Sequence, residues 1–198
     1  MYEYRKLTEI ERHDVVEQRK KRGFPWHRPP HPETDLNYRI VTATCFEHKK
    51  ILDSEFRLRW FEQELLESLK NNEPISCAAW CVLPNHYHLL VRVGNFKGFS
   101  ANLGKLHGRT SYKINKEDQN RGRKVWYRSQ DRVMRSQAHF YTSLNYIHNN
   151  PVKHGYVKKW QNWPFSSIHW YFNCKGRDWL LDKWKKYPLR DYGAKWDQ

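Results

Sequence analysis

Two apolar runs that follow one another directly constrain the fold of this chain most. Residues 75–83 and 86–93 are separated only by Pro84 and Asn85. Because a proline interrupts a helix, and because two residues suffice to join adjacent antiparallel strands, this pattern favours a β-hairpin over one continuous helix. A lone hairpin is marginally stable in water, so further elements must cover it. We therefore expect an antiparallel sheet at the centre of the fold.

Further elements are predicted on both sides of the hairpin. Residues 38–46 are rich in β-branched side chains and predict a strand. Asp53 or Ser54 can cap a helix that runs to about Lys70, because apolar residues recur there every three to four positions. These are Phe56, Trp60, Phe61, Leu65 and Leu69. A turn at residues 71–74 ends this helix.

A second helix is predicted over residues 100–116, although Gly104 and Gly108 weaken it. A short strand follows, and then a helix that begins at Ser136 and stops at Asn150, since the residue before Pro151 is disfavoured in the α region. Its apolar stripe is Phe140, Leu144 and Ile147. The order strand, helix, hairpin, helix, short strand, helix indicates an α+β fold, an antiparallel β-sheet with packed helices.

The length of 198 residues suits one domain. We expect residues 1–34 to form a basic extension that ends in a proline-rich linker, residues 35–172 to form the domain, and residues 173–198 to form a tail. No apolar run is long enough for a membrane span, and the first residues lack the apolar run of a signal peptide. We therefore expect no membrane partner and a cytoplasmic, nucleoid-associated location. The cysteines, Cys45, Cys77, Cys81 and Cys174, are expected to stay reduced and to fill the core.

The charge of the chain indicates a polyanionic partner. There are 36 Lys and Arg against 21 Asp and Glu, a net charge of +15, and aromatic residues make up 16% of the chain. Phosphates attract the cations and unstacked bases attract aromatic rings, so the combination suits nucleic acid. The segment 101–135 holds ten Lys and Arg but three acids. Trp126, Tyr127 and Trp163 are candidates for base stacking or for the core.

His86 and His88 are the sharpest local feature. The chain has 11 histidines, so a pair two residues apart is nearly expected by chance. In a strand, however, both rings point to the same face while Tyr87 points to the other. Two imidazoles flanked by Leu and Val need partners, which either a shared metal ion or ordinary hydrogen bonds would provide.

Tyr146 and Asn150 lie four residues apart on one face of the last predicted helix, away from its apolar stripe. A tyrosine oxygen beside a divalent ion can attack a phosphodiester, and an asparagine oxygen can bind the ion. The alternative is a surface tyrosine and a helix-terminal asparagine.

Together these motifs resemble the REP-associated tyrosine transposases, which belong to the single-tyrosine HUH transposase superfamily of IS200-like transposases. The resemblance spans residues 38–170. It is carried by Leu83-Pro84-Asn85-His86-Tyr87-His88, by residues 144–155 including Tyr146 and Asn150, and by Trp163-Pro164-Phe165-Ser166-Ser167.

The resemblance implies a ferredoxin-like fold and a metal-dependent enzyme that nicks and rejoins single-stranded DNA at hairpins through a covalent 5′-phosphotyrosine. It makes Tyr146 the nucleophile, His86, His88 and Asn150 the ligands of Mg²⁺ or Mn²⁺, and single-stranded or hairpin DNA the partner, without a nucleotide cofactor. Because imidazole is a softer ligand than Mg²⁺ prefers, we expect Mn²⁺ to bind more tightly in vitro. The DNA-binding residues are expected to be Arg109, Lys113, Arg121, Arg123, Lys124, Arg128, Arg132, Arg135, Lys153, His154 and Lys158.

Two other functions are compatible with these residues. One is a hairpin DNA- or RNA-binding protein that kept the scaffold without the chemistry. The other is a zinc protein that uses Cys77, Cys81, His86 and His88. Within the enzyme hypothesis, His139 is a possible base, whereas Tyr141 lies about 140° from Tyr146 around the helix and is expected to pack. The sequence does not distinguish a monomer from a dimer.

Overall fold

A computed structural model describes residues 8–21, 38–70, 75–194 and 196. The chain divides into two compact units, residues 1–33 and residues 34–198, which are described separately. The proline-rich part of the predicted linker and the predicted turn at residues 71–74 lie outside the described residues.

The first unit contains one described helix, α2 (Glu9–Lys21). The sequence analysis did not predict it. Thr8 caps the helix, because its hydroxyl accepts a hydrogen bond from the Glu11 amide while the Glu11 carboxylate accepts one from the Thr8 amide. This reciprocal pair satisfies two backbone donors that a helix N-terminus otherwise leaves unpaired.

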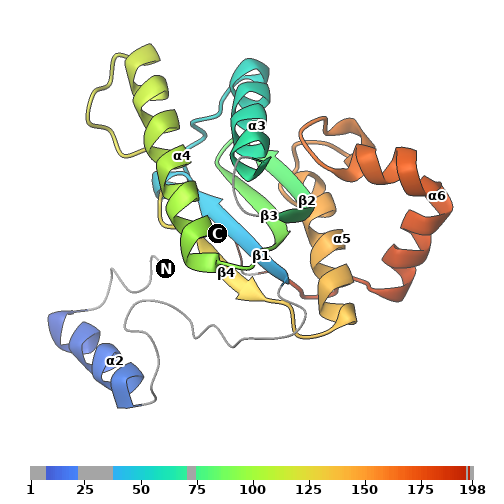
Figure 1. Cartoon of the computed structure of the whole chain (residues 1–198), viewed down its shortest axis with the longest axis horizontal. Helices are drawn as coiled ribbons and strands as arrows, with labels where there is room; N and C mark the ends of the chain where they lie inside the picture. Colours follow the sequence, from blue (N-terminus) through green and yellow to red (C-terminus); the bar gives the residue numbers. More distant parts are fainter. Residues whose placement is uncertain (1–7, 22–37, 71–74, 195, 197–198) are drawn as a thin grey trace. The chain divides into compact units, whose positions relative to one another are not determined.

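The second unit is built on a four-stranded antiparallel sheet of β1 (Tyr38–Thr44), β2 (Ser76–Leu83), β3 (His86–Arg92) and β4 (Gln130–Val133). The strand order is β2-β3-β1-β4 (Figure 1). With α3 (Glu55–Lys70) between β1 and β2, and α4 (Phe96–Glu117) between β3 and β4, the chain follows the β-α-β-β-α-β order of the ferredoxin-like fold. The predicted fold class, hairpin and short strand are confirmed.

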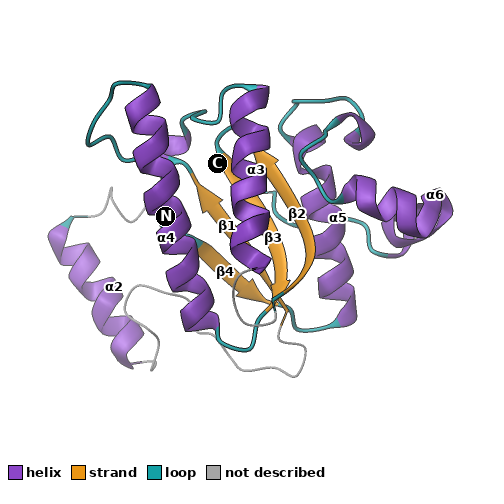
Figure 2. Cartoon of the chain, turned by 45° about the horizontal axis from the view of Figure 1, so that its top comes forward, coloured by secondary structure: helices purple, strands orange, loops and turns teal. Residues whose placement is uncertain are grey.

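Helices α3 and α4 lie side by side on one face of the sheet (Figure 2). The predicted cap of α3 is confirmed, since the Ser54 hydroxyl accepts from the Arg57 amide at 3.2 Å. Its buried stripe differs from the prediction: Leu58 is buried, Trp60 is half-buried and Phe56 is 69% exposed. Phe56 precedes Leu58 by two positions, about 200° around the helix, so both cannot face the sheet.

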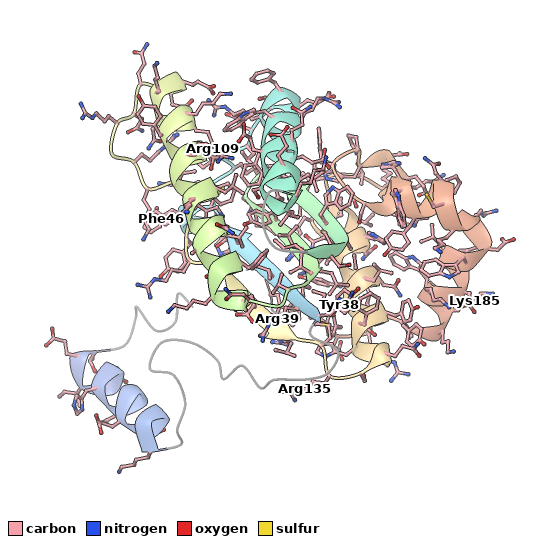
Figure 3. The ribbon with its side chains drawn as sticks, in the orientation of Figure 1. Tyr38, Arg39, Phe46, Arg109, Arg135 and Lys185 are labelled. Carbon is pink, nitrogen blue, oxygen red and sulfur yellow. The ribbon has the colours of Figure 1, made fainter. Side chains whose placement is uncertain are left out.

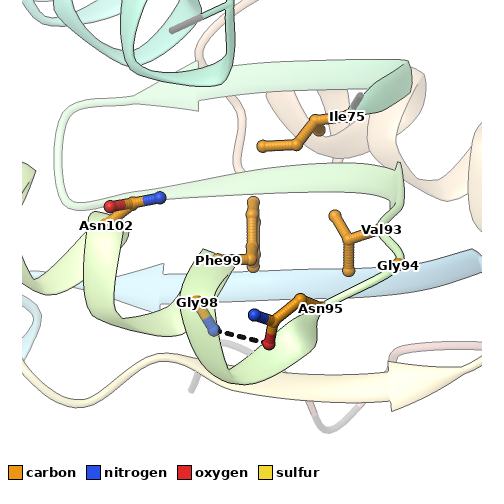
Figure 4. A pocket seen from close by; sticks show the side chains of 7 residues that line it. All are labelled: Ile75, Val93, Gly94, Asn95, Gly98, Phe99 and Asn102. Atoms are coloured by element: carbon orange, nitrogen blue, oxygen red, sulfur yellow. Dashed lines mark hydrogen bonds between the residues drawn. The ribbon is translucent and has the colours of Figure 1, made fainter. Parts of the chain in front are cut away.

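Helix α4 begins four residues earlier than predicted. The Asn95 side chain accepts a hydrogen bond from the Gly98 amide at 2.9 Å and caps the helix there (Figure 4). Gly104 and Gly108 do not break it, because its apolar stripe, Phe99, Leu103, Leu106 and Ile114, is buried against the rest of the core.

Helix α5 (Gln137–Lys153) continues through Pro151, so the prediction that it stops before this proline was wrong. The helix ends only two residues later, and Pro151 is buried. One missing N–H and the ring of the proline are tolerated because packing holds the last turn in place. The Asn150 and Pro151 carbonyls accept from the amides of His154 and Tyr156, at 3.0 and 2.9 Å.

The two faces of the sheet differ in chemistry. Residues directly opposite in antiparallel strands share a face, so the register places Thr44 with His86 and Thr42 with His88 and Gln130. This face carries α5, which lies against β2 and β3. Tyr87 points to the other face, where its ring meets Phe61 of α3 and Trp126.

Beyond α5, the short 3-10 turn Trp160–Asn162 leads to α6 (Ile168–Lys186). Helix α6 is kinked at Gly176, which has a φ of 81°. It crosses the predicted start of the tail at residue 173. None of the described helices has an apolar stretch of the length needed to span a bilayer.

The cysteines were expected to fill the core, and Trp126 and Trp163 were candidates for the core or for base stacking. Cys45 and Cys81 are buried, and burial raises the pKa of the Cys45 thiol to about 12, so it stays neutral in the core. Cys174 is exposed, so the expectation was wrong there. Trp126 and Trp163 are core residues, with indole N–H groups that donate to Thr110 Oγ1 and to the Val82 carbonyl.

Candidate active site

His86 and His88 project from β3 toward α5, with ring centroids 4.9 Å apart. Both side chains are buried. Tyr87, between them, faces the opposite side, and its hydroxyl meets His107 Nε2 at 2.9 Å. A buried tyrosine needs such a partner.

Tyr146 and Asn150 reach the two histidines from α5. Asn150 Oδ1 lies 2.9 Å from His86 Nε2, and the ring centroid of Tyr146 lies 5.3 Å from that of His88. The structure thus brings together the four residues that the sequence analysis selected from two elements more than 50 residues apart. One turn of helix places the tyrosine over one histidine and the asparagine over the other.

The donor set at this site fits a divalent cation. A neutral His86 ring can donate to only one of its two acceptor neighbours, Asn85 Oδ1 at 2.7 Å from Nδ1 and Asn150 Oδ1 at 2.9 Å from Nε2. With the hydrogen on Nδ1, the lone pair of Nε2 faces the lone pairs of Asn150 Oδ1. A cation between two such atoms would satisfy both, and imidazole nitrogen with amide oxygen is a donor set that accepts Mn²⁺ or Mg²⁺.

The zinc site of the second alternative is not formed. Within the described part of the chain, no three His, Cys, Asp or Glu side chains are grouped so that they could hold a metal ion. Cys81 lies opposite His88, but a bulge interrupts the β2 register between Cys77 and Ala79, and the Cys77 thiol donates to the Ala79 carbonyl. The hypothesis of a zinc centre from Cys77, Cys81, His86 and His88 was therefore wrong.

Tyr146 is covered by the segment after α6, a feature that the sequence analysis missed. Its side chain is 1% exposed, and its ring contacts the rings of Tyr192 and Trp196. Lys153 Nζ donates to the Tyr146 hydroxyl at 3.2 Å and to the carbonyls of Gly193 and Trp196, at 2.8 and 3.1 Å. The only sequence signal was the aromatic content of residues 187–196.

Two other side chains of α5 have structural contacts instead of a place at the site. His139 accepts from the Arg135 amide through Nδ1, and its Nε2 lies 3.1 Å from the Tyr192 hydroxyl. Both ring nitrogens are thus engaged away from Tyr146, so the hypothesis that His139 is its base was wrong for this conformation. Tyr141 stacks on Tyr187 with centroids 4.9 Å apart, as expected of a packing residue.

Five of the predicted DNA-binding cations contact a carboxylate or an aromatic ring. Arg109 and Arg123 pair with the carboxylates of Glu64 and Asp118, at 2.6 and 2.5 Å. Some cations lie over aromatic rings, which attract them through the negative face of the ring. Lys113 lies over Trp60, Lys124 over Phe46 and Tyr127, and Arg132 over Trp196.

Four of the other predicted residues are exposed, and two contact residues of the candidate active site. Arg121, Arg128, Arg135 and Lys158 are exposed. Figure 3 shows Arg109 on α4 beside α3 and Arg135 toward the opposite end of the same view. Lys153 contacts Tyr146, and the His154 ring lies 4.9 Å from that of His86. Arg109 and Arg135 therefore do not lie in one compact patch.

A small pocket lies away from these residues. It is lined by Ile75, Val93, Gly94, Asn95, Gly98, Phe99 and Asn102 (Figure 4). His86 begins β3 and Val93 directly follows its last residue, about 23 Å away at ~3.3 Å per residue. The pocket therefore does not belong to the histidine site.

Known proteins are similar to this chain in sequence. Residues 33–150 match the family model described as "Transposase IS200 like". A REP-associated tyrosine transposase homologue from Haemophilus influenzae is 32% identical over 106 residues, which cover 48% of this chain and 60% of that protein. The REP-associated tyrosine transposase of Escherichia coli is 28% identical over 138 residues, which cover 67% of this chain and 80% of that protein.

A solved structure shares the fold. It is a REP-associated tyrosine transposase bound to a REP hairpin, with a TM-score of 0.59 and 20% sequence identity. The match covers 75% of this chain and 86% of the other.

Proposed function

The chain belongs to the IS200-like transposase family, and from this premise we propose that it cuts and rejoins single-stranded DNA beside a hairpin. The single observation that carries the proposal is the meeting of Tyr146 and Asn150 with His88 and His86, between α5 and β3. A nucleophile and three candidate ligands converge there from two elements.

In the proposed reaction, the Tyr146 oxygen attacks a backbone phosphorus and the bond from phosphorus to the 3′ oxygen breaks. Tyrosine gives up its proton, the 3′ oxygen takes one, and the DNA leaves with a free 3′ hydroxyl. The 5′ phosphate stays on Tyr146 as a phosphodiester, so a second 3′ hydroxyl can reverse the step without an external energy source. The proposal therefore needs no nucleotide cofactor.

His86, His88 and Asn150 would hold the divalent ion that the family resemblance implies. When bound, Mn²⁺ or Mg²⁺ would act as a Lewis acid that withdraws charge from the phosphate oxygens. The chain's own contribution is the orientation of the ligands. Thr42 Oγ1 meets His88 Nδ1 at 2.7 Å, and Asn85 Oδ1 meets His86 Nδ1 at the same distance. Hydrogen bonds to the second ring nitrogen are the usual way to fix a histidine ligand.

The proposed DNA path follows the half of the sheet that α5 does not cover. On this face Thr42 and Gln130 continue the row of His88 and Thr44 continues that of His86, while Arg132 lies one row further, opposite Ile40. Gln130 and Arg132 are exposed. Hydroxyl, amide and guanidinium groups suit sugars, bases and phosphates. We expect the single strand to cross here and reach Tyr146.

The proposed substrate is a hairpin with a single-stranded flank. It is supported by the names of the relatives and by the REP hairpin in the solved structure of similar fold. Because Tyr146 is buried beneath Tyr192 and Trp196, a phosphate reaches its oxygen only when this segment moves aside. Productive binding therefore includes displacement of residues 192–196.

The proposal is tested with labelled stem-loop DNA that carries single-stranded flanks. Incubation of the whole chain with Mn²⁺ should give a covalent adduct on a denaturing gel, and Tyr146→Phe, His86→Ala or a chelator should abolish it. Tyr141→Phe is the matched control and should retain the adduct. No adduct with either Mn²⁺ or Mg²⁺ would contradict the proposal. Hairpin binding that persists without any adduct would instead indicate a binding protein.

A further inference from the structure

Asn85 occupies the two-residue turn between β2 and β3, beside the first histidine. Its amide makes two hydrogen bonds in opposite directions. Nδ2 donates to the His48 carbonyl at 3.3 Å, and Oδ1 lies 2.7 Å from His86 Nδ1. The Asn85 carbonyl also accepts from the Cys45 amide at 2.7 Å, so the backbone of the turn is held as well.

The orientation of this amide is fixed by its partner at residue 48. A backbone carbonyl can only accept, so the NH₂ group of Asn85 must face it and the oxygen must face His86. An oxygen at this position accepts a hydrogen from Nδ1. Asn150 Oδ1 faces Nε2 at 2.9 Å, but Asn150 Nδ2 has no hydrogen-bond partner among the residues that the structure describes, so this amide can turn over whereas that of Asn85 is held. We therefore expect the neutral His86 ring to carry its hydrogen on Nδ1 and its lone pair on Nε2.

The lone pair on Nε2 is what a metal ligand requires. We propose that Asn85 is a positioning residue, which selects the metal-binding form of His86 before any ion arrives. The inference rests on the proposed function, because it assigns a purpose to Asn85 only if His86 binds a cation.

The backbone that presents the His48 carbonyl is strained. Glu47 and His48 have φ values of 57° and 52°, in the left-handed region that residues other than glycine rarely adopt. Each such residue destabilises the folded backbone, and such strain is often retained at functional sites. Here the two residues turn the chain so that the His48 carbonyl meets Asn85, which gives the strain a role.

The second histidine is held differently. Its Nδ1 meets Thr42 Oγ1 at 2.7 Å, and a hydroxyl can donate or accept. The contact orients the ring of His88 without dictating which nitrogen carries the hydrogen. Asn85, and not Thr42, is therefore the residue that selects a tautomer in this pair of histidines.

The first test is Mn²⁺ binding, measured by electron paramagnetic resonance on the metal-free protein. Asn85→Ala should weaken binding by about 10- to 100-fold, the usual cost of losing the hydrogen-bond partner of a histidine ligand. Asn85→Asp keeps an oxygen that accepts from Nδ1 and should keep Mn²⁺ affinity within about threefold, well short of that loss. Asn173→Ala, at an exposed position on α6, is the matched control and should bind as the wild type does.

The second test is the tautomer of His86 in the metal-free wild-type protein, read from its ¹⁵N ring shifts. Hydrogen on Nδ1 is expected, and Asn85→Ala should give a mixture. Hydrogen on Nε2 in the wild type, or unchanged Mn²⁺ affinity in folded Asn85→Ala, would overturn the inference. If the wild type binds no Mn²⁺, the metal part of the proposed function fails and takes the metal role of Asn85 with it, while the tautomer measurement still decides whether Asn85 sets the form of His86.

Discussion

The backbone of Gly193 lies directly against the ring of Tyr146. Gly193 has a φ of 74°, and a β-carbon at this position would overlap the tyrosine ring. Glycine is required at residue 193 for two reasons: its left-handed backbone conformation and the close approach of its backbone to the Tyr146 ring. The segment that ends at Trp196 can therefore cover the proposed nucleophile only while residue 193 has no side chain.

Gly193→Ala should open this cover. The left-handed conformation alone costs alanine about 1–2 kcal/mol, and the overlap adds to it. Amides of residues 189–194 should exchange hydrogen about tenfold faster or more, the equivalent of ~1.4 kcal/mol of local stability. Hydrogen exchange with mass spectrometry measures this.

Gly122→Ala provides the matched control. Gly122 has a φ of 85°, but a β-carbon there would meet no atom within 4 Å. Gly122→Ala should lower the stability of the fold through the left-handed conformation at residue 122, but it should leave the hydrogen exchange of residues 189–194 unchanged. Equal exchange in the two variants would contradict the role assigned to Gly193.

Hairpin binding should depend on the cations that the fold leaves exposed. Arg128 is exposed, whereas the Arg109 guanidinium contacts Glu64 at 2.6 and 3.0 Å. Arg128→Ala should lower the slope of log affinity against log salt by about 0.9 for a lost phosphate contact, and Arg109→Ala should lower it less. Fluorescence anisotropy of a labelled hairpin across a salt series measures both slopes. A larger loss for Arg109→Ala would show that the pair with Glu64 opens on binding.

Acid should destabilise the domain through His107, whose pKa burial lowers to about 4. In the unfolded chain a histidine has a pKa of about 6.5, so below that pH the unfolded state binds a proton that the folded state does not. The free energy of unfolding should therefore fall as pH drops from about 6.5 toward 4. Between pH 7 and 5 the loss from this group is about 2 kcal/mol.

Urea unfolding of His107→Gln tests this dependence. Glutamine can still bond to the Tyr87 hydroxyl but does not titrate, so the pH dependence should be smaller by about 2 kcal/mol over the same range. His13→Gln, at an exposed position on α2, should leave it unchanged. Burial also lowers the pKa of His148, to about 3, so His148 should contribute equally to the pH dependence of unfolding in both variants. An unaltered pH dependence in His107→Gln would contradict the account.

The fold was predictable wherever local patterns act alone. Pro84 and Asn85 between two apolar runs predicted the hairpin, and the caps Ser54 and Ser136 placed the starts of two helices. Pro151 misled because the local preference against a proline in a helix is outweighed by the packing of the last turn of α5. Tertiary packing of this kind leaves no trace in a local window of sequence.

The site was predictable in its residues but not in its accessibility. Strand and helix periods placed His86 with His88, and Tyr146 with Asn150, and the family resemblance joined the two pairs. That Tyr192 and Trp196 cover Tyr146 depends on contacts across about 50 residues of chain, which no periodicity reveals. The pairing of Arg109 with Glu64 is of the same kind, since charge counts do not show which cations are neutralised.

Mass spectrometry of the covalent adduct tests the central claim most directly. Trypsin should release residues 136–153 as one peptide that contains both Tyr141 and Tyr146, and fragmentation separates the two. The account predicts a nucleotide attached through its 5′ phosphate to Tyr146. A nucleotide on Tyr141, on another residue, or on no part of the chain would contradict it.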